Sequence, residues 1–365
     1  MLVKRSETRR KTRFLATQVK RSGSANGEAV LSEHLNMIDR EIKKNFENRN
    51  FPRPLYDMMR YHLGWLDENL RETHQYRGKR FRPTLCLLTY NALSGVYDKA
   101  LPAAAAIELI HNFSLIHDDI EDMDEERRHK PTVWKLWGVA QAINVGDGMH
   151  VLANLAALRL KELNVTSSKI VEVLEILNRS IIDLCEGQYL DMCFEDKLDI
   201  TTKMYLKMIS RKTASLVEAS TLIGATLATE DEKIVEHFRK FGRNIGTAFQ
   251  IVDDIIGIWE KKTGKPKASD IRNKKKTLPI LYAFEKASKK EKMLLVQTFK
   301  KEKLSEDDIS NVLGILENVA AHEYSKNIAE SYESRGLEEL SSTGIENEAM
   351  EKLKMLAEFL VKRKY

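Results

Sequence analysis

The segment Ile107-Glu-Leu-Ile-His-Asn-Phe-Ser-Leu-Ile-His-Asp-Asp-Ile-Glu-Asp122 joins a strongly apolar stretch directly to a cluster of acidic residues. On a helix, Asp118 and Asp122 are i, i+4 neighbours on one face, with Asp119 beside them. Like charges so placed repel, and here they follow a stretch that should be partly buried. One interpretation is a solvated acidic face. The other is a site for Mg²⁺, which binds oxygen ligands and commonly bridges protein carboxylates to phosphates.

A second acidic pair, Asp253 and Asp254, lies 135 residues after Asp118 and is again embedded in an apolar helical segment, FQIVDDIIG at 249–257. Two such pairs indicate two helices that face each other across one cavity. Carboxylates on opposing walls with metal ions between them would clamp a pyrophosphate group.

The chain around these clusters shows helical periodicity almost throughout. No proline lies between Pro131 and Pro266 or after Pro279, and interior prolines would break helices. Strand-like alternation is nearly absent, and no repeat of fixed period is found. We therefore expect one large all-α domain over residues 31–365. The expected helical segments are 31–50, 55–73, 83–95, 101–122, 133–162, 167–195, 201–228, 230–260 and 278–365. Thr201 and a Thr229/Glu232 capping box are expected at two helix starts.

The net charge of +5 comes from the first thirty residues, which hold eight basic and two acidic residues. The other 335 residues sum to −1, so the folded body is not expected to bind nucleic acid. A disordered, solvated leader over residues 1–30 is the main interpretation of this segment, and an organellar targeting peptide is the alternative. No run of about 18 apolar residues occurs, which excludes an integral membrane helix. Three cysteines without metal-ligand spacing suit a reducing compartment, so a cytoplasmic protein is expected.

Basic residues recur beside apolar stretches and could hold a second diphosphate without metal. Arginine binds phosphate oxygens with two hydrogen bonds, and lysine supplies a point charge. The candidates are Lys79, Arg82, Arg127, Arg128, Arg211, Lys212, Lys265, Lys275 and Lys276.

With these motifs, the chain from about residue 40 to its end resembles the trans-isoprenyl diphosphate synthases, or polyprenyl synthetases. The resemblance implies an all-α helical bundle of the isoprenoid synthase type with a central apolar cavity. The matching pieces are GKRFRP at 78–83, HNFSLIHDDIED at 111–122, RRHKPT at 127–132, GQYLD at 187–191, RKT at 211–213, FQIVDD at 249–254, GKPKASD at 264–270 and KKTLP at 275–279.

The resemblance also implies roles for single residues. Two or three Mg²⁺ ions would be held by Asp118, Asp119 and Asp122 on one wall and by Asp253 and Asp254 on the other. The allylic diphosphate would contact Arg127, Lys212 and Lys265, with Thr213 and Gln250 beside it. Isopentenyl diphosphate would be held by Lys79, Arg82, His111 and Arg128. A homodimer is expected as well.

Two positions depart from the family pattern. The second motif often reads DDxxD, but its last position is Gly257, so metal binding on that wall would depend on Asp253, with Asp270 helping through water. The usual glycine after the arginine pair is His129, which leaves the loop geometry open.

Product length in this family depends on what closes the apolar tunnel below the first motif. Phe113 lies five residues before Asp118, about 7 Å down a helix, and its neighbour is the small Ser114. One aromatic with a small neighbour resembles archaeal-type geranylgeranyl diphosphate synthases, which predicts a twenty-carbon product. Phe113 as an ordinary core residue is the alternative.

Other functions remain as alternatives to this one. A farnesyl diphosphate synthase or a synthase of products with 25 or more carbons would use the same chemistry. A terpene cyclase would need different residues at Gly257 and Lys261, and a squalene-type enzyme would not need Lys79 and Arg82. A non-catalytic partner subunit would normally lack one aspartate cluster. A metal phosphohydrolase built on His117 and Asp118 lacks further histidine ligands.

Overall fold

A computed structural model describes residues 27–47, 49, 51–73, 78–195, 197–260 and 268–362. Residues 1–26 of the expected leader lie outside the described part, so its disorder stays a prediction. Residues 27–30 are helical, as part of a first helix whose described residues are 27–44. Lys265 also lies outside the described residues.

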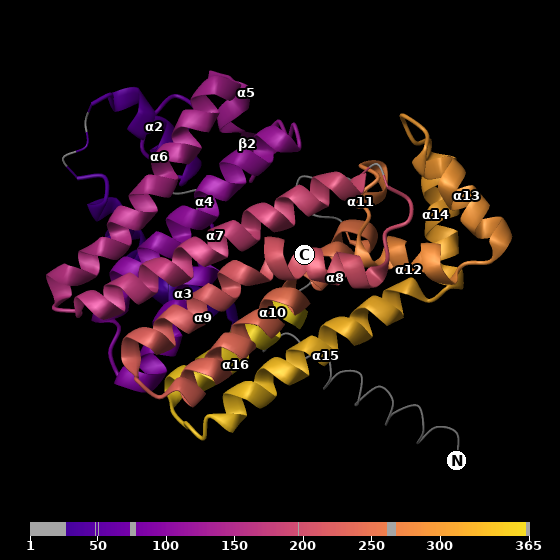
Figure 1. Ribbon diagram of the computed structural model, residues 1–365. Helices are drawn as coiled ribbons and strands as arrows, with labels where there is room; N and C mark the ends of the chain where they lie inside the picture. The colour runs from indigo at the N-terminus through magenta and orange to yellow at the C-terminus, as the bar shows by residue number, and fades with distance from the viewer. Residues whose placement is uncertain are drawn as a thin grey trace, which may run out of the picture.

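The described chain is almost entirely helical, which confirms the all-α prediction (Figure 1). The α-helices after the first are α2 (Arg53–His62), α3 (Phe81–Ser94), α4 (Leu101–Glu121), α5 (Val133–Trp137), α6 (Val139–Leu158), α7 (Ser167–Glu195), α8 (Thr202–Lys212), α9 (Ala214–Ala228), α10 (Glu232–Trp259), α11 (Ser269–Arg272), α12 (Leu278–Lys286), α13 (Lys289–Phe299), α14 (Glu306–Asn318), α15 (Ala321–Ser342) and α16 (Glu348–Lys362). Two 3₁₀ turns span Asp98–Ala100 and Arg159–Leu163. A short antiparallel hairpin pairs β1 (Glu126–Arg127) with β2 (Lys130–Pro131).

Several predicted helical segments differ from the structure, and 278–365 divides into α12 to α16. The segment 133–162 divides at Gly138, whose φ of 83° suits glycine, and 201–228 divides at Thr213. The segment 55–73 was predicted too long, because α2 ends at His62 and Gly64 follows with a φ of 82°.

One of the two predicted caps is correct. Thr201 accepts a hydrogen bond from the Met204 amide. The capping box of Thr229 and Glu232 is wrong, because Asp231 is the N-cap of α10 and accepts from Lys233 and Ile234. The Thr229 hydroxyl instead accepts from the Asp231 amide. The carboxylate stands closer to the helix start and satisfies two of its free amides.

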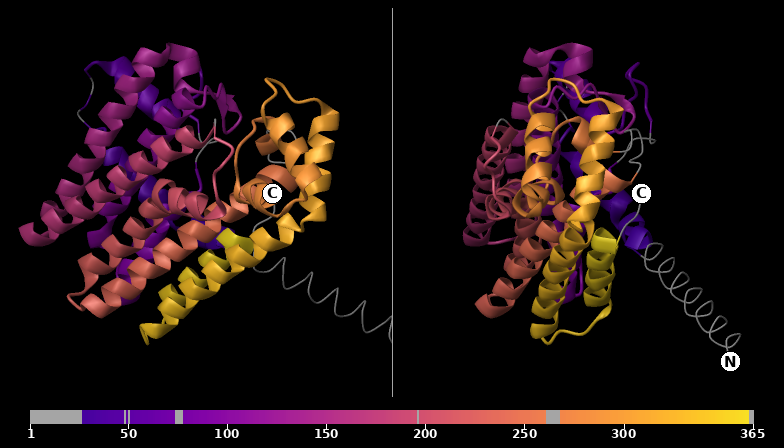
Figure 2. Two further views of the ribbon diagram at one scale, coloured as in Figure 1. Left: turned by 45° about the vertical axis from the view of Figure 1, so that its right-hand side comes forward. Right: turned by 90° about the vertical axis from the view of Figure 1, so that its right-hand side faces the viewer.

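The long helices pack side by side and enclose the site from several directions. The most extensive contacts join α4 to α6, α10 to α15, α10 to α9, and α3 to α9. Figure 2 shows α13 and α14 grouped at one end, in orange, while α15 and α16 cover α10. Apolar side chains of α3, α4, α6, α7 and α9 form one buried cluster. This packing brings the acidic end of α4 close to the later part of α10.

Candidate active site

Two adjoining cavities lie between α4, α7, α8, α9 and α10. The larger, about 470 Å³, has mostly apolar walls that include Phe113, Leu184 and Phe249. The smaller, about 300 Å³, is lined by aspartates and lysines. The residues common to both linings are Asp118, Lys212, Thr213, Gln250 and Asp253. The two acidic motifs thus meet at one place, where an apolar cavity adjoins a charged one.

The first acidic cluster is held by cations from other segments. Arg127 donates from Nε to Asp119 Oδ1 at 2.5 Å, and its Nη2 lies 3.5 Å from Asp118 Oδ2. Lys275 Nζ lies 3.5 Å from Asp122 Oδ2. Burial raises the pKa of Asp119 to about 7 although Arg127 opposes the shift, and burial also raises the pKa of Asp122. A nearby cation or metal ion therefore stabilises the charged form of these carboxylates.

Lys212 joins the first cluster to α7. Its Nζ donates to Asp191 Oδ2 at 2.6 Å and lies 3.4 Å from Asp118 Oδ1. Burial alone would lower the pKa of this lysine, but the two carboxylates outweigh burial and raise it. Asp191 was given no role in the sequence analysis, although the GQYLD motif that contains it was noted.

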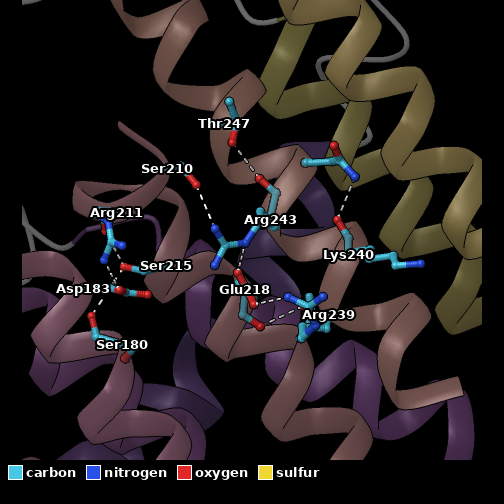
Figure 3. Close-up of polar contacts among 12 residues, drawn as sticks. Ser180, Asp183, Ser210, Arg211, Ser215, Glu218, Arg239, Lys240, Arg243 and Thr247 are labelled. Carbon is cyan, nitrogen blue, oxygen red and sulfur yellow. Dashed lines mark hydrogen bonds and ion pairs between the residues drawn. The ribbon is translucent and has the colours of Figure 1, made fainter. Parts of the chain in front are cut away.

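The backbone at Lys212 packs against α7 at a glycine. A Cβ on Gly187 would overlap the amide nitrogen and Cα of Lys212, so a larger residue there would push the two helices apart. Arg211 joins the same point to α7, because it donates to Asp183 Oδ1 at 2.7 Å (Figure 3). It also pairs with Glu186.

An ion-pair group around the buried Glu218 holds the other side of α8. Arg243 of α10 donates from Nη1 to Ser210 Oγ at 2.8 Å and from Nε to Glu218. Arg239 also donates to Glu218, at 2.9 Å, so this buried carboxylate on α9 joins two arginines (Figure 3). Both residues before Lys212 are therefore anchored to neighbouring helices.

The two aspartates of the second motif have different surroundings. Asp253 lines both cavities. Asp254 is only 3% exposed and accepts from the Tyr205 hydroxyl, from Gln250 Nε2 at 3.1 Å and from the Leu278 amide at 3.3 Å. Burial raises the pKa of Asp254 to about 7, while the Tyr205 hydrogen bond opposes the shift. Asp253 thus borders both cavities, whereas Asp254, at the wall of the charged cavity, joins α10 to α8 and α12.

Gly257, at the last position of the second motif, leaves room for a carboxylate from elsewhere in the chain. A Cβ at residue 257 would overlap the carboxylate of Asp270. Asp270 lines the same charged cavity as Asp253 and Asp254. An aspartate from α11 thus occupies the space in which a side chain at 257 would start.

Three of the four residues expected at the second diphosphate lie close together. Arg82 Nη1 is 3.3 Å from His111 Nε2, and burial together with Arg82 and Arg128 lowers the pKa of His111 well below its ordinary value. Arg128 has a left-handed φ of 53°, and burial lowers its pKa to about 10. Lys79 is half-exposed, with Nζ 3.7 Å from Glu28 and above the Phe359 ring.

Arg80 lies within the GKRFRP motif but has a structural role that the sequence analysis missed. Its guanidinium is buried and donates to Glu108 Oε1 at 2.6 Å, to Asp39 Oδ1 at 3.1 Å and to the Leu63 carbonyl. A carboxylate inside the apolar stretch 107–116, Glu108, was the available signal for a buried partner.

Phe113 lines the large cavity, as expected for a residue that limits chain length, and it also packs in the core. Its ring stacks on that of His150 in α6, with centroids 4.9 Å apart. Ser114 beside it donates to the His111 carbonyl at 2.8 Å and also lines the cavity. The contact with His150 was not predicted, because no local pattern connects α4 with α6.

Among the described residues, no helix is long and apolar enough to cross a membrane. In the same part of the chain, no three His, Cys, Asp or Glu side chains are arranged as a ready metal site. The aspartates of the first cluster contact Arg127, Lys212 and Lys275 instead.

Comparisons with known proteins agree on one family. The family model described as polyprenyl synthetase matches residues 64–316. A (2E,6E)-farnesyl diphosphate synthase of Mycobacterium tuberculosis is 36% identical over 83% of this chain and 84% of its own. A geranylgeranyl diphosphate synthase of Sulfolobus acidocaldarius is 39% identical over 79% of this chain and 87% of its own. The crystal structure of geranylgeranyl pyrophosphate synthetase from Pyrococcus horikoshii superposes with a TM-score of 0.83 at 37% identity, covering 93% and 98% of the two chains.

Proposed function

The chain belongs to the polyprenyl synthetase family, and we propose that it condenses isopentenyl diphosphate with an allylic diphosphate to make geranylgeranyl diphosphate. The observation that carries the proposal is the junction of the two cavities. Aspartates of α4 and α10 line a charged space that opens on an apolar one, as a substrate with a diphosphate head and a hydrocarbon tail requires.

Members of this family generally depend on Mg²⁺. The donor set fits that ion, because Asp118, Asp122 and Asp253 offer carboxylate oxygens on a single cavity. The buried Oδ2 of Asp119 has no hydrogen-bond partner among the described residues, which also suits a cation. Bound with the diphosphate, the metal ions would neutralise the charge of the departing pyrophosphate.

The reaction needs no protein nucleophile. The bond between the first carbon of the allylic chain and the diphosphate oxygen breaks, and its electron pair leaves with pyrophosphate. The double bond of isopentenyl diphosphate attacks the resulting allylic cation and forms the new carbon–carbon bond. Loss of a proton, which the released pyrophosphate accepts, restores a double bond.

The residues of this chain bind and orient the two substrates. Arg127 and Lys212 stand beside Asp118, where their charges would stabilise the leaving diphosphate. Arg82 and Arg128 would hold isopentenyl diphosphate with a neutral His111 beside Arg82. We include Lys79 and Lys265 in these two groups by family resemblance.

Phe113 supports a short product. Because it lines the apolar cavity below the aspartates and is backed by His150, its ring would stop the growing tail. Relatives include both farnesyl and geranylgeranyl synthases, so product length is the more specific part of the proposal.

We infer a homodimer formed through α6 and α7. Large apolar side chains are exposed along one stripe of α6, one or two turns apart: Val139, Ile143, Val151, Leu155 and Leu158. Val171 and Ile182 of α7 are more than 60% exposed as well. A second copy would cover these surfaces, and sedimentation of Val151→Asp as a monomer would support this assignment.

A cytoplasmic location is proposed from the unpaired cysteines.

The direct test is incubation of the purified protein with Mg²⁺, labelled isopentenyl diphosphate and dimethylallyl, geranyl or farnesyl diphosphate. Products are dephosphorylated and sized. A dominant twenty-carbon alcohol is expected. A fifteen-carbon or longer product would retain the chemistry and reject the role of Phe113. No incorporation from any primer would favour a non-catalytic partner subunit instead.

A further inference from the structure

A continuous hydrogen-bonded chain starts at a buried tyrosine that no motif singled out. Tyr205, 4% exposed in α8, donates its hydroxyl proton to Asp254. Asp254 accepts from Gln250 Nε2 on its other oxygen, at 3.1 Å. Gln250 Oε1 in turn accepts from Thr213 Oγ1 at 2.8 Å. The chain therefore runs from a buried residue at the wall of the charged cavity to two residues that line both cavities.

This chain determines which way the Gln250 side chain points. A carboxamide has a donor end and an acceptor end of nearly equal size, so it can bind either way round in a polar site. A carboxylate only accepts hydrogen bonds, and Asp254 therefore fixes the NH₂ end of Gln250 on its side. The oxygen end is left on the side of Thr213 and the cavity junction.

The carboxylate must itself be held for this to work. Asp254 Oδ2 accepts hydrogen bonds from the Tyr205 hydroxyl and the Leu278 amide, and Oδ1 accepts one from Gln250 Nε2. Without the hydroxyl, the buried carboxylate would lose one of its donors, and the remaining contacts would let it rotate. A rotated Asp254 no longer holds the NH₂ end of Gln250 on its side.

We propose that Tyr205 is a positioning residue that acts through Asp254 to keep the Gln250 carboxamide oxygen, rather than its NH₂ group, toward the reacting carbons. The inference rests on the proposed function, in which an allylic cation forms at the cavity junction. The oxygen end of an amide dipole stabilises a positive charge, and the NH₂ end repels it. The orientation affects the energy of the transition state more than that of the bound substrate, so its loss should lower kcat rather than raise KM.

The test is a double-mutant cycle of Tyr205→Phe and Gln250→Met in the full-length protein. Tyr205→Phe is expected to lower kcat about tenfold, a smaller loss than removal of a whole stabilising group, with the KM of the allylic diphosphate unchanged. In the Gln250→Met background, the same change is expected to cost less than about twofold, because the group that it orients is gone. Equal losses in both backgrounds, or no loss in either, would overturn the proposal.

Tyr90→Phe is the matched control, because Tyr90 is an equally buried tyrosine, in α3, 4% exposed. It is expected to leave kcat unchanged. A comparable loss of kcat in Tyr90→Phe would show that any buried hydroxyl matters, and would contradict the specific role of Tyr205.

A binding measurement judges the proposal without turnover. Calorimetry compares two analogues of the allylic diphosphate. One carries an ammonium nitrogen at the position of the cationic carbon. The other has an uncharged hydrocarbon chain, with sulfur in place of the oxygen that links it to the diphosphate. Tyr205→Phe is expected to bind the ammonium analogue about tenfold more weakly and the neutral analogue equally well. Equal changes for both analogues would reject the role of Tyr205. An inactive wild-type protein would reject the proposed function, whereas the binding of the two analogues to wild type and Tyr205→Phe could still be compared.

Discussion

Gly187 of α7 packs directly against the backbone of Lys212, so closely that a Cβ at residue 187 would overlap the Lys212 amide nitrogen. The ammonium of Lys212 reaches Asp118 and Asp191 from that fixed point. Helix packing in the core thus determines where a cation stands in the charged cavity.

Gly187→Ala is expected to displace Lys212 and lower kcat by more than about tenfold, with a loss of about 1–3 kcal/mol in the free energy of unfolding from overpacking. Steady-state kinetics and chemical denaturation measure both. Gly314→Ala in α14 is the control, since a Cβ there meets nothing within 4 Å. It should gain up to about 1 kcal/mol of stability from helix propensity and keep full activity. Unaltered kinetics in Gly187→Ala would show that the close contact does not position Lys212.

Phe113→Ala is expected to lengthen the product, because it opens the end of the apolar cavity above His150. Products made from farnesyl diphosphate are sized by chromatography. Phe299→Ala removes an equally buried aromatic ring from a different core cluster and should destabilise the protein without changing product length. Identical product lengths from Phe113→Ala and wild type would exclude Phe113 as the floor.

His129 stands where the family usually has glycine, and the structure gives it a φ of 61°. With Arg128 at 53°, it forms the two-residue turn between β1 and β2, a conformation that favours glycine. His129→Gly should therefore raise the free energy of unfolding by about 0.5–1 kcal/mol. The relief of backbone strain stabilises the fold, and the greater freedom of glycine in the unfolded chain offsets part of that gain. His129→Val should lower it. Thermal denaturation that ranks valine at or above glycine would contradict the turn geometry.

Lys130 is buried against Tyr61, and burial together with Arg128 lowers its pKa to about 7. The unfolded lysine titrates near pH 10.4, so between these two values the unfolded chain binds the extra proton. Its contribution to stability therefore rises with pH from about 7 to about 10, by at most about 1.4 kcal/mol per pH unit. The difference in unfolding free energy between wild type and Lys130→Met should show this slope. A flat difference would mean that Lys130 stays charged in the fold.

The sequence predicted most helices and the meeting of Asp118 with Asp253, because both depend on local periodicity and on charges placed in apolar segments. Contacts between residues far apart in the sequence could not be predicted from it. Nothing near Asp254 indicates Tyr205 or the Leu278 amide. Asp270 was expected to help on this wall, but the sequence did not indicate that its carboxylate fills the space beside Gly257. The breaks at Gly138 and Thr213 were missed because periodicity continues across them, while packing decides the bend.

The central claim is that aspartates of α4 and α10 form one metal-dependent site for the allylic diphosphate. Calorimetric binding of a geranyl S-thiolodiphosphate, which cannot ionise readily, tests it most directly in wild type, Asp118→Asn and Asp253→Asn. We predict binding that requires Mg²⁺ and is weakened at least about tenfold by either substitution alone. Binding that persists without Mg²⁺, or that is unaffected by one of the two substitutions, would contradict a shared site.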